Sequence, residues 1–375
     1  MSRLSPPPIN LIHVIESSAY GTLSMVCLLA NHQCKAGMNV TVIYSNRPET
    51  PENIQTLFES NVELINIQMH KKVGLKVFSA LRAIRNITKT RKADVVLLHS
   101  SIAGAYGRIS LSLTDTPVFY VPHCISFMRE DIGFIYRTLF IGLEYTASIL
   151  KNSTYIACSN SEFETIKKTI PFVSCLTVQN AIDTEKWLSP VTERKNKIVV
   201  NVGMLRTQKN PMRFANLRRK ASEAGLQLDF IWIGDGNDES VKIALKHSGV
   251  EVIGHKNPEE IKTILRDSTW FLSTSSWEGL PVAPLEAMAT GCVCVLSDCT
   301  GNRDIVKNYK TGFLYNDDNE VIDILKKYSD NNKVLSEIAQ TGQRYCVENH
   351  SQNSYLANML SVILQNKKFE LTRKF

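Results

Sequence analysis

The stretch at residues 270–296 reads WFLSTSSWEGLPVAPLEAMATGCVCVL and carries the clearest structural pattern of the chain. It opens with one apolar run, Trp270 to Ser273, and closes with a second, Val293 to Leu296. Between them lie a polar loop and a segment, from Pro284 onward, with a helical pattern. Short apolar runs joined by a helix are typical of parallel strands that are covered on both faces. The stretch therefore predicts one βαβ unit of a parallel sheet.

Two acids in this stretch indicate where a ligand binds. Glu278 is predicted to lie in the loop and Glu286 in the helix, and the seven residues between them are uncharged. Both carboxylates would face the carboxyl end of the sheet, where open α/β sheets bind ligands. Carboxylates accept hydrogen bonds from hydroxyl groups, and amides of a glycine-containing turn can approach a phosphate, so the pair suits a polyhydroxylated ligand. The alternative is a surface acid followed by a helix-capping acid.

Length and composition indicate a globular protein of two domains. The 375 residues exceed what one core usually serves, and 43% hydrophobic with 21% charged residues is far from a disordered composition. No apolar run approaches the roughly 18 residues that span a bilayer, and residues 1–10 lack the core of a signal peptide, so we expect a cytosolic protein.

The nine cysteines form no C-x-x-C pair and are predicted to be reduced, which indicates neither zinc nor redox chemistry.

The same alternation of strands and helices continues along the chain and breaks once, in a polar stretch. The sequence therefore predicts an α/β protein of two doubly wound, Rossmann-like domains that face each other across a cleft. The region from Asn332 to Leu364 has the pattern of a helix. The predicted parts are a first domain at 1–180, a linker at 181–196, a second domain at 197–350, and a C-terminal helix with a basic tail at 351–375.

The predicted strands are rich in β-branched residues and are bounded by turn residues. Helical patterns separate most of them, so parallel connections are expected. In the first domain they are residues 9–15, 39–44, 62–67, 94–99, 117–123, 154–159 and 173–178. In the second domain they are residues 197–202, 226–233, 250–253, 270–273 and 293–296.

Residues 70–92 form a basic segment that contains no acid. Its apolar residues recur at helical spacing, which predicts a basic amphipathic helix. The helix either packs on the sheet with a solvated basic side or also attracts an anionic membrane, at about 1 kcal/mol per basic residue near the surface. Nucleic acid is not predicted as a partner, since no binding signature or set of stacking aromatics occurs. The basic residues are Lys71, Lys72, Lys76, Arg82, Arg85, Lys89, Arg91 and Lys92.

A second loop, residues 201–211, carries two cations between the first strand of the second domain and a helix. Gly203 permits close backbone approach, and Arg206 and Lys209 lie one helical step apart near the helix N-terminus. Together they could neutralise a pyrophosphate without a metal ion. The alternative is a pair of exposed cations on an ordinary loop.

Three other strand ends carry candidate ligand contacts. Gly234-Asp235-Gly236 looks like part of a dinucleotide fingerprint, but its acids would repel a pyrophosphate, so a tight turn at the edge of the cleft is the better interpretation. In the first domain, His123 ends a strand and is a candidate for contacting a sugar hydroxyl. Gly21, followed by Thr22, comes after the first strand and is a candidate for close backbone approach.

Several signatures are absent from the sequence. No Asp-x-Asp occurs, so a nucleotide-sugar site that depends on a metal clamp is not supported. No G-x-x-x-x-G-K-[ST] and no G-x-S-x-G occurs either. ATP-driven chemistry and ordinary ester hydrolysis are therefore not favoured.

Taken together, these residues resemble the glycosyltransferase family 4 (group 1) enzymes of the GT-B fold. The similarity is strongest from Asn201 to about Tyr315, where it includes both loops and the Glu278 to Gly291 block. The first domain is similar at Gly21 and His123, and Asn180-Ala181-Ile182-Asp183 is similar to the Asn-Gly-Val-Asp of that family.

The resemblance implies a retaining transfer of sugar from a nucleotide-sugar, which is a co-substrate, with no cofactor and no metal. It implies that Glu278 binds hydroxyls of the donor sugar, that Glu286 binds the ribose, and that Arg206 and Lys209 hold the diphosphate. His123 would contact a sugar hydroxyl. The other implied donor contacts are Gly203, Gly234, Gly254 and His255 beside the base, and Gly279, Leu280, Pro281 and Val282 at the phosphate; Gly21 and Thr22 would lie on the acceptor side.

Three departures from the family pattern affect these assignments. Only one glycine, Gly21, occupies the first-domain loop, which affects the expected acceptor contacts. Met204 stands where the family often has an arginine, so Arg206 is expected to substitute. Pro281 has no amide hydrogen to donate where many relatives have glycine, so the phosphate must rely on its neighbours.

We therefore expect a transferase of a hexose or N-acetylhexosamine, from a UDP-sugar to a lipid-linked saccharide of bacterial surface polysaccharide such as O-antigen or capsule. It would work at the inner face of the cytoplasmic membrane as a peripheral protein. The alternatives are a nucleotide-sugar epimerase or sugar phosphorylase of the same fold, and a non-catalytic sugar-nucleotide-binding subunit. UDP-sugars without an acceptor would reveal an epimerase, and donor binding without transfer would favour the subunit.

Overall fold

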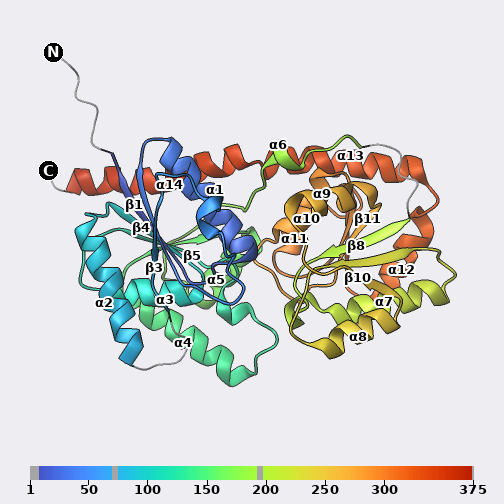
Figure 1. Ribbon diagram of the computed structural model, residues 1–375, viewed down its shortest axis with the longest axis horizontal. Helices are drawn as coiled ribbons and strands as arrows, with labels where there is room; N and C mark the ends of the chain where they lie inside the picture. The colour runs from blue at the N-terminus through green and yellow to red at the C-terminus, as the bar shows by residue number, and fades with distance from the viewer. Residues whose placement is uncertain (1–7, 70–74, 192–196, 374–375) are drawn as a thin grey trace, which may run out of the picture. The chain divides into compact units, whose positions relative to one another are not determined.

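The computed structural model describes residues 8–69, 75–191 and 197–373, and its helices and strands form two α/β units (Figure 1). The chain enters the second unit after Gln179 and returns to the first at Tyr355. The first unit consists of residues up to 128, 133–179 and 355 onward, and the second consists of residues 129–132 and 180–354.

The first unit is built on a seven-stranded sheet in which every pair of neighbouring strands is parallel. The strand order is β3-β2-β1-β4-β5-β6-β7, so the winding direction reverses between β1 and β4. Such a reversal opens a crevice at the carboxyl ends of the two strands. The strands are β1 (Asn10–Ile15), β2 (Asn39–Tyr44), β3 (Glu63–Asn66), β4 (Val95–His99), β5 (Val118–Val121), β6 (Thr154–Ala157) and β7 (Cys175–Thr177).

Helices cover both faces of the first sheet. Residues of α1 share a buried cluster with β1 and β2, whereas residues of α2, α3 and α5 share a larger one with β4, β5 and β6. The predicted basic helix is present as α2, and residues 70–74 lie outside the described part of the chain. The helical segments are α1 (Tyr20–Lys35), η1 (Ile54–Leu57), α2 (Leu75–Thr90), α3 (Ser101–Ser110), η2 (Ser126–Met128), α4 (Phe134–Leu150), α5 (Asn160–Thr169) and α14 (Gln352–Arg373).

The second unit repeats this plan with six parallel strands in the order β10-β9-β8-β11-β12-β13. Here the winding reverses between β8 and β11, the strands before the two predicted loops. Strand β13, which the sequence pattern does not predict, has three residues and directly follows the turn glycine Gly312. The strands are β8 (Ile198–Val202), β9 (Asp229–Ile233), β10 (Val250–Val252), β11 (Trp270–Ser273), β12 (Val293–Ser297) and β13 (Phe313–Tyr315).

The helices of the second unit start where the sequence supplies a cap. Asn257 caps α9 and exchanges hydrogen bonds with Glu260, and Pro258 occupies the first turn, where its missing amide hydrogen costs nothing. The helical segments are α6 (Thr184–Trp187), η3 (Thr207–Lys209), α7 (Pro211–Glu223), α8 (Glu239–His247), α9 (Pro258–Asp267), α10 (Val282–Ala289), α11 (Asn302–Ile305), α12 (Asp318–Tyr328) and α13 (Asn332–Asn349).

The predicted C-terminal helix is two helices, α13 and α14, with a break at His350. The backbone amide of Ile182 donates to the carbonyl of His350, and the amide of Gln352 donates back to the carbonyl of Ile182. This short parallel bridge uses backbone groups that a continuous helix would have paired internally. The periodicity is therefore helical, but tertiary hydrogen bonding interrupts it.

The predicted fold class is confirmed, because both units are doubly wound parallel sheets of Rossmann type. The nine cysteines are free thiols. None of the helices in the described ranges combines the length and the hydropathy that a bilayer span requires.

Candidate functional site

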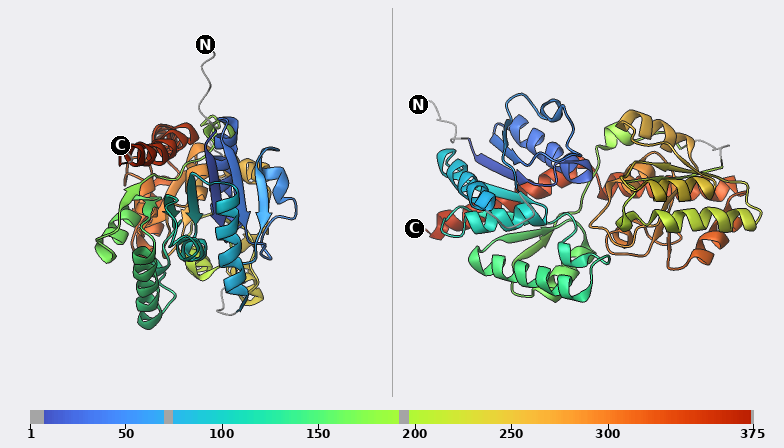
Figure 2. Two further views of the ribbon diagram at one scale, coloured as in Figure 1. Left: turned by 90° about the vertical axis from the view of Figure 1, so that its left-hand side faces the viewer. Right: turned by 60° about the horizontal axis from the view of Figure 1, so that its bottom comes forward.

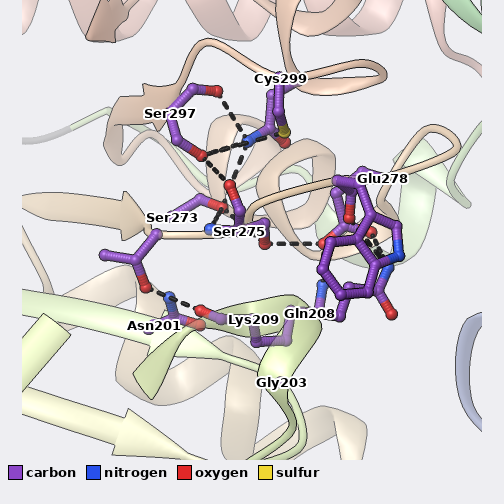
Figure 3. A network of polar contacts seen from close by, with 12 residues as sticks. Asn201, Gly203, Gln208, Lys209, Ser273, Ser275, Glu278, Ser297 and Cys299 are labelled. Carbon is purple, nitrogen blue, oxygen red and sulfur yellow. Dashed lines mark hydrogen bonds and ion pairs between the residues drawn. The ribbon is translucent and has the colours of Figure 1, made fainter. Parts of the chain in front are cut away.

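Glu278 lies in the loop after β11 and is almost fully buried, with 5% of its surface exposed. Three side chains donate hydrogen bonds to its carboxylate (Figure 3). Lys209 Nζ and Ser275 Oγ donate to Oε1 at 2.6 and 2.7 Å, and Gln208 Nε2 donates to Oε2 at 3.1 Å. These donors satisfy the oxygens of a carboxylate that burial removes from water. The alternative of a solvated surface acid is therefore wrong.

The two predicted loops are joined by hydrogen bonds that fix Glu278 and Lys209 against each other. Gln208 Nε2 donates to the carbonyl of Trp277, and Thr274 Oγ1 donates to the carbonyl of Lys209. Beneath them, Asn201 on β8 donates through Nδ2 to the carbonyl of Leu272 at 2.7 Å (Figure 3). The carboxyl ends of β8 and β11 are thus tied at the point where the winding reverses, which is where such sheets bind ligands.

The cations of the first loop occupy different environments. Lys209 ends the short helix η3 and is largely covered, while Arg206 precedes η3 and is exposed. Asn210, in the left-handed conformation, then caps α7 by accepting from the amide of Arg213. The structure therefore brings Lys209 to Glu278, and the assignment of Arg206 to a diphosphate stays a prediction.

Glu286 lies in the middle of α10 rather than at its cap, so the capping alternative is also excluded. Its carboxyl receives no hydrogen bond from any residue that the structure describes. Desolvation raises the pKa of Glu286 to about 8, and the charge of Lys186 only partly offsets this. A desolvated carboxyl without donors is suited to receive hydroxyl hydrogens from a ligand.

The loop between Glu278 and Glu286 packs so closely against residue 301 that this residue must be a glycine. The amide of Glu278 donates to the carbonyl of Thr300, and any Cβ on Gly301, whose φ is +85°, would clash with the carbonyl of Gly279. Asn180 Nδ2 donates to the carbonyl of Leu280 at 2.9 Å. Across the described chain, the amides of Gly279 and Leu280 have no acceptor. With Pro281 preceding α10, these amides and the helix N-terminus offer donors to an anion.

Three predicted glycines meet at the ends of β8, β9 and β10. Gly234, at a φ of +135°, packs so tightly against the carbonyl of Gly203 that no side chain would fit. Its amide donates to the carbonyl of Gly254 at 2.8 Å, and His255 follows, exposed. Asp235 pairs with Lys242 at 2.7 Å, as expected for a turn rather than a pyrophosphate site.

His123 of the first unit follows β5 and adopts a φ of +54°. It ends a row of polar side chains that the sequence motifs do not predict. His123 Nε2 lies 3.1 Å from His99 Nδ1, His99 Nε2 lies 3.0 Å from His13 Nδ1, and His13 Nε2 lies 2.7 Å from Gln33 Oε1. A histidine among the apolar residues of a strand, as in the NLIHVI of β1, was the available signal.

Burial keeps this row uncharged. Desolvation lowers the pKa of His13 and of His123 to about 4, and the pKa of His99 is lowered by burial and by its two histidine neighbours. The imidazoles are therefore neutral at physiological pH and act only as hydrogen-bond donors and acceptors.

Gly21 and Thr22 lie in the first turn of α1, not in the loop before it. The unusual backbone belongs to Tyr20, whose φ is +53°. The loop position of this glycine is therefore wrong, because α1 begins at Tyr20, and the role of Gly21 in close backbone approach stays a prediction.

Two family descriptions match the chain. "Glycosyltransferase Family 4" matches residues 21–186 and "Glycosyl transferases group 1" matches residues 183–345. The chain is 31% identical to the Escherichia coli UDP-Gal:alpha-D-GlcNAc-diphosphoundecaprenol alpha-1,3-galactosyltransferase, over 70% of this chain and 73% of that protein. The chain belongs to the group 1 glycosyltransferases. The predicted family and glycosyltransferase activity are thereby confirmed.

Two solved structures have the same fold as this chain. Sucrose-phosphate synthase from Thermosynechococcus elongatus superposes with a TM-score of 0.81 at 14% identity, covering 96% of this chain and 99% of that one. The lipopolysaccharide outer core galactosyltransferase WaaB, in its apo form, gives a TM-score of 0.71 at 19% identity, covering 96% and 100%. At these identities the similarity establishes the GT-B fold of this glycosyltransferase and nothing about its substrates.

Proposed function

We propose that this glycosyltransferase moves a hexose or N-acetylhexosamine from a UDP-sugar to a lipid-linked saccharide in bacterial surface polysaccharide synthesis. The donor and acceptor classes are supported by the Escherichia coli relative, whose name specifies UDP-Gal and a diphosphoundecaprenol-linked sugar. Retention of the anomeric configuration, independence of metal ions and peripheral membrane association belong to the same proposal.

The observation that carries the proposal is the buried pair of Lys209 and Glu278 at the reversal point of the second sheet. An ammonium has three hydrogens, so Lys209 can keep its bond to Glu278 and offer others to a diphosphate. Glu278 can meanwhile accept hydroxyl hydrogens of the donor sugar. Acid and base remain paired in the free enzyme, so neither charge is left uncompensated in a dry site.

The remaining residues contact different parts of the donor in this proposal. The amides of Gly279 and Leu280 and the start of α10 face the diphosphate, Arg206 adds positive charge, and Glu286 receives the ribose hydroxyls. The base lies near the Gly254 to His255 turn. In the first unit, His123 contacts a hydroxyl of a sugar substrate.

Chemistry in this site is electrostatic and positional. The bond between the anomeric carbon and the diphosphate oxygen breaks while the acceptor oxygen attacks from the same face. The acceptor proton passes to the departing phosphate oxygen, and Lys209 stabilises the negative charge that develops there.

Replacement of the paired residues tests this assignment. We expect Glu278→Ala and Lys209→Ala each to reduce the transfer rate by about 100-fold or more, which corresponds to about 3 kcal/mol. The assay measures transfer from UDP-galactose, UDP-glucose or their N-acetylated analogues to GlcNAc-diphosphoundecaprenol. A variant with the wild-type rate would show that its residue does not have the proposed role.

A matched control exists in the same unit. Lys197 Nζ and Asp330 Oδ1 also lie 2.6 Å apart, but both side chains are exposed and Lys197 precedes β8 at the opposite end of the sheet. Lys197→Ala should leave transfer unchanged, because an exposed pair contributes little to stability.

Two further measurements test the finer claims. The configuration of the new linkage, determined by nuclear magnetic resonance, should match that of the donor sugar. Transfer in the presence of a chelator should proceed at the uninhibited rate. Inversion would exclude same-face attack, and a chelator-sensitive rate restored by a divalent cation would show that a metal takes part.

A further inference from the structure

Helix α4 exposes large apolar side chains along its whole length. Phe134 is 83% exposed, Ile135 is 73% exposed and Leu143 is 64% exposed. Eight of the twenty exposed large apolar residues in the described chain lie on this one helix. They are Phe134, Ile135, Tyr136, Leu139, Leu143, Tyr145, Ile149 and Leu150.

The outer face of α4 also lacks charge. At about 100° per residue, the exposed positions cover an arc of roughly 200°. Besides the apolar residues, this arc contains Thr138, Gly142 and Thr146, which are neutral. The two charged residues of the helix, Arg137 and Glu144, both fall on the inward arc. The helix therefore has the reverse of the usual pattern, in which apolar residues face the core.

A buried polar cluster holds α4 in this orientation. Glu144 Oε2 accepts from Arg108 Nη2 on α3 at 2.6 Å, and Glu144 Oε1 accepts from the hydroxyl of Tyr120 on β5 at 3.0 Å. The hydroxyl of Tyr155 on β6 also donates to Glu144, at 3.1 Å. A buried ion pair is weak evidence for stability, but breaking it leaves a buried charge. A rotation of α4 that buried its leucines would break the pair of Glu144 and Arg108 and leave a buried charge without a partner.

Positive charge accompanies the apolar face. Helix α3 packs against both α2 and α4, so the three helices lie in a row on one side of the first sheet (Figure 2). The solvent-facing side of α2 carries Lys76, Arg82, Arg85 and Lys89. Apolar side chains beside basic ones are complementary to an anionic lipid surface. A second copy of the chain would present the same positive charge.

We propose that α4 inserts its outer face into the interfacial region of an anionic bilayer while α2 contacts the lipid headgroups. This deepens the membrane association in the proposed function, and it moves the main contact from the basic segment at residues 70–92 to α4. A helix in the plane of the interface needs only one apolar face, in agreement with the absence of a bilayer-spanning helix from the described ranges.

Vesicle flotation of the full chain tests the proposal without donor or acceptor. Wild-type protein should float with vesicles of phosphatidylglycerol and phosphatidylcholine, and the double variant Leu139→Glu and Leu143→Glu should bind at least tenfold more weakly. Leu57→Glu, at an exposed leucine on η1 in the same unit, is the matched control and should bind as wild type. Equal flotation of the double variant would overturn the proposal.

A fluorescent reporter measures insertion directly. The four native tryptophans are buried in the second unit, so a new one on α4 can be distinguished by its quenching. Brominated lipid should quench Tyr136→Trp and leave Leu57→Trp unquenched. If Tyr136→Trp is not quenched, or if light scattering shows a dimer that the double variant makes monomeric, the face binds something other than lipid. Transfer to a short-chain acceptor in detergent tests the proposed function separately.

The row of histidines carries an independent inference. Gln33 Oε1 can only accept, so His13 Nε2 holds the proton and His13 Nδ1 accepts from His99. Because the proton of His99 lies on Nε2, His99 Nδ1 accepts a hydrogen bond from His123 Nε2. His123 Nδ1 then keeps a lone pair, and none of the described residues donates to it.

We infer that Gln33, His13 and His99 are positioning residues that hold His123 in the tautomer whose Nδ1 accepts a substrate hydroxyl hydrogen. This rests on the proposed contact of His123 with a sugar hydroxyl. Gln33→Met removes the acceptor that sets the direction of the row, while Gln33→Glu retains an acceptor oxygen.

Two readouts test this inference. In protein labelled with ¹⁵N-histidine, Gln33→Met should change the ring-nitrogen shifts that report tautomer, and Gln33→Glu should restore them. Gln33→Met should lower kcat about five- to tenfold in the wild-type background and have no effect in a His123→Ala background. Unchanged shifts, or an equal loss without His123, would overturn the inference. The resonance measurement holds even if the wild type transfers no sugar.

Discussion

At the scale of single residues, the two glutamates that define the donor loop differ in electrostatic environment. Glu278 accepts three side-chain hydrogen bonds, one from a lysine. Glu286 accepts none from the described residues, and desolvation raises its pKa to about 8. The sequence shows two equivalent acids, so this difference comes from the elements that surround each of them.

Glu286 should release a proton when donor binds. With its pKa raised from 4.5 to about 8, the free carboxyl is mostly protonated at pH 7. Ribose hydroxyls that donate to it favour the ionised form, so UDP-sugar affinity should rise with pH between 6 and 8. Titration calorimetry at pH 7 in buffers of different ionisation enthalpy should detect up to about one proton released. Glu286→Gln should abolish the release, and an unaltered release would assign the proton elsewhere.

His13 should make the folded chain less stable in mild acid. Its pKa is lowered from 6.5 to about 4, so the unfolded chain binds the proton first as pH falls. Stability is then lost from about pH 6.5 toward pH 4, by about 2 kcal/mol at pH 5. Urea unfolding at pH 7 and pH 5 measures this. In His13→Gln the loss should be smaller by that amount, and an identical loss would exclude His13 as its source.

At the scale of elements, the donor loop depends on a backbone contact as much as on its own residues. Gly301, which precedes α11, lies against the carbonyl of Gly279 and the backbone of Glu278. The helix α10 and the loop before it can hold their position only while this contact has no side chain. A sequence pattern identifies a turn glycine here but not its partner.

Gly301→Ala should lower the free energy of unfolding more than Gly37→Ala does. Gly37 has a φ of +83° with open space around it, and Gly301 has a φ of +85° with the carbonyl of Gly279 in the way. Both substitutions carry the cost of a left-handed backbone, about 1–2 kcal/mol. Only Gly301→Ala must also move the donor loop, so it should lower the transfer rate as well as the free energy of unfolding. If both variants behave alike, the contact has no role in the site.

At the scale of the whole molecule, each unit has its own buried core around its own sheet. The proposed donor contacts are concentrated in the second unit, and the proposed membrane contact lies in the first. This division suits an enzyme whose donor is soluble and whose acceptor is fixed in a membrane.

Binding of UDP should therefore protect one unit selectively. In hydrogen exchange, saturating UDP should slow exchange in the loops at residues 203–209 and 278–282 and leave the strands of the first sheet unchanged. A ligand at 100 times its Kd stabilises the binding-competent state by about 2.7 kcal/mol. Equal protection of both sheets would contradict the assignment of nucleotide contacts to the second unit.

From the amino-acid sequence one can predict the two parallel sheets, the helices between their strands and the positions of Glu278, Lys209 and His123 at strand ends. Periodicity and turn residues are local properties, so they can be read without the fold. Strand β13 and the break at His350 were not predicted, because hydrogen bonds between distant segments set them.

Which side chains contact each other depends on the tertiary fold and cannot be predicted from the sequence pattern. Lys209 reaches Glu278 from 69 positions away, and His13 reaches His99 from 86 positions away, through parallel strands that bring distant residues to neighbouring places. The outward rotation of α4 depends likewise on Glu144 meeting Arg108, a buried pair that spacing along the chain does not reveal. The energy of an ion pair and the pKa of a buried group both depend on the residues around them. These surroundings are set by the fold and not by spacing along the chain.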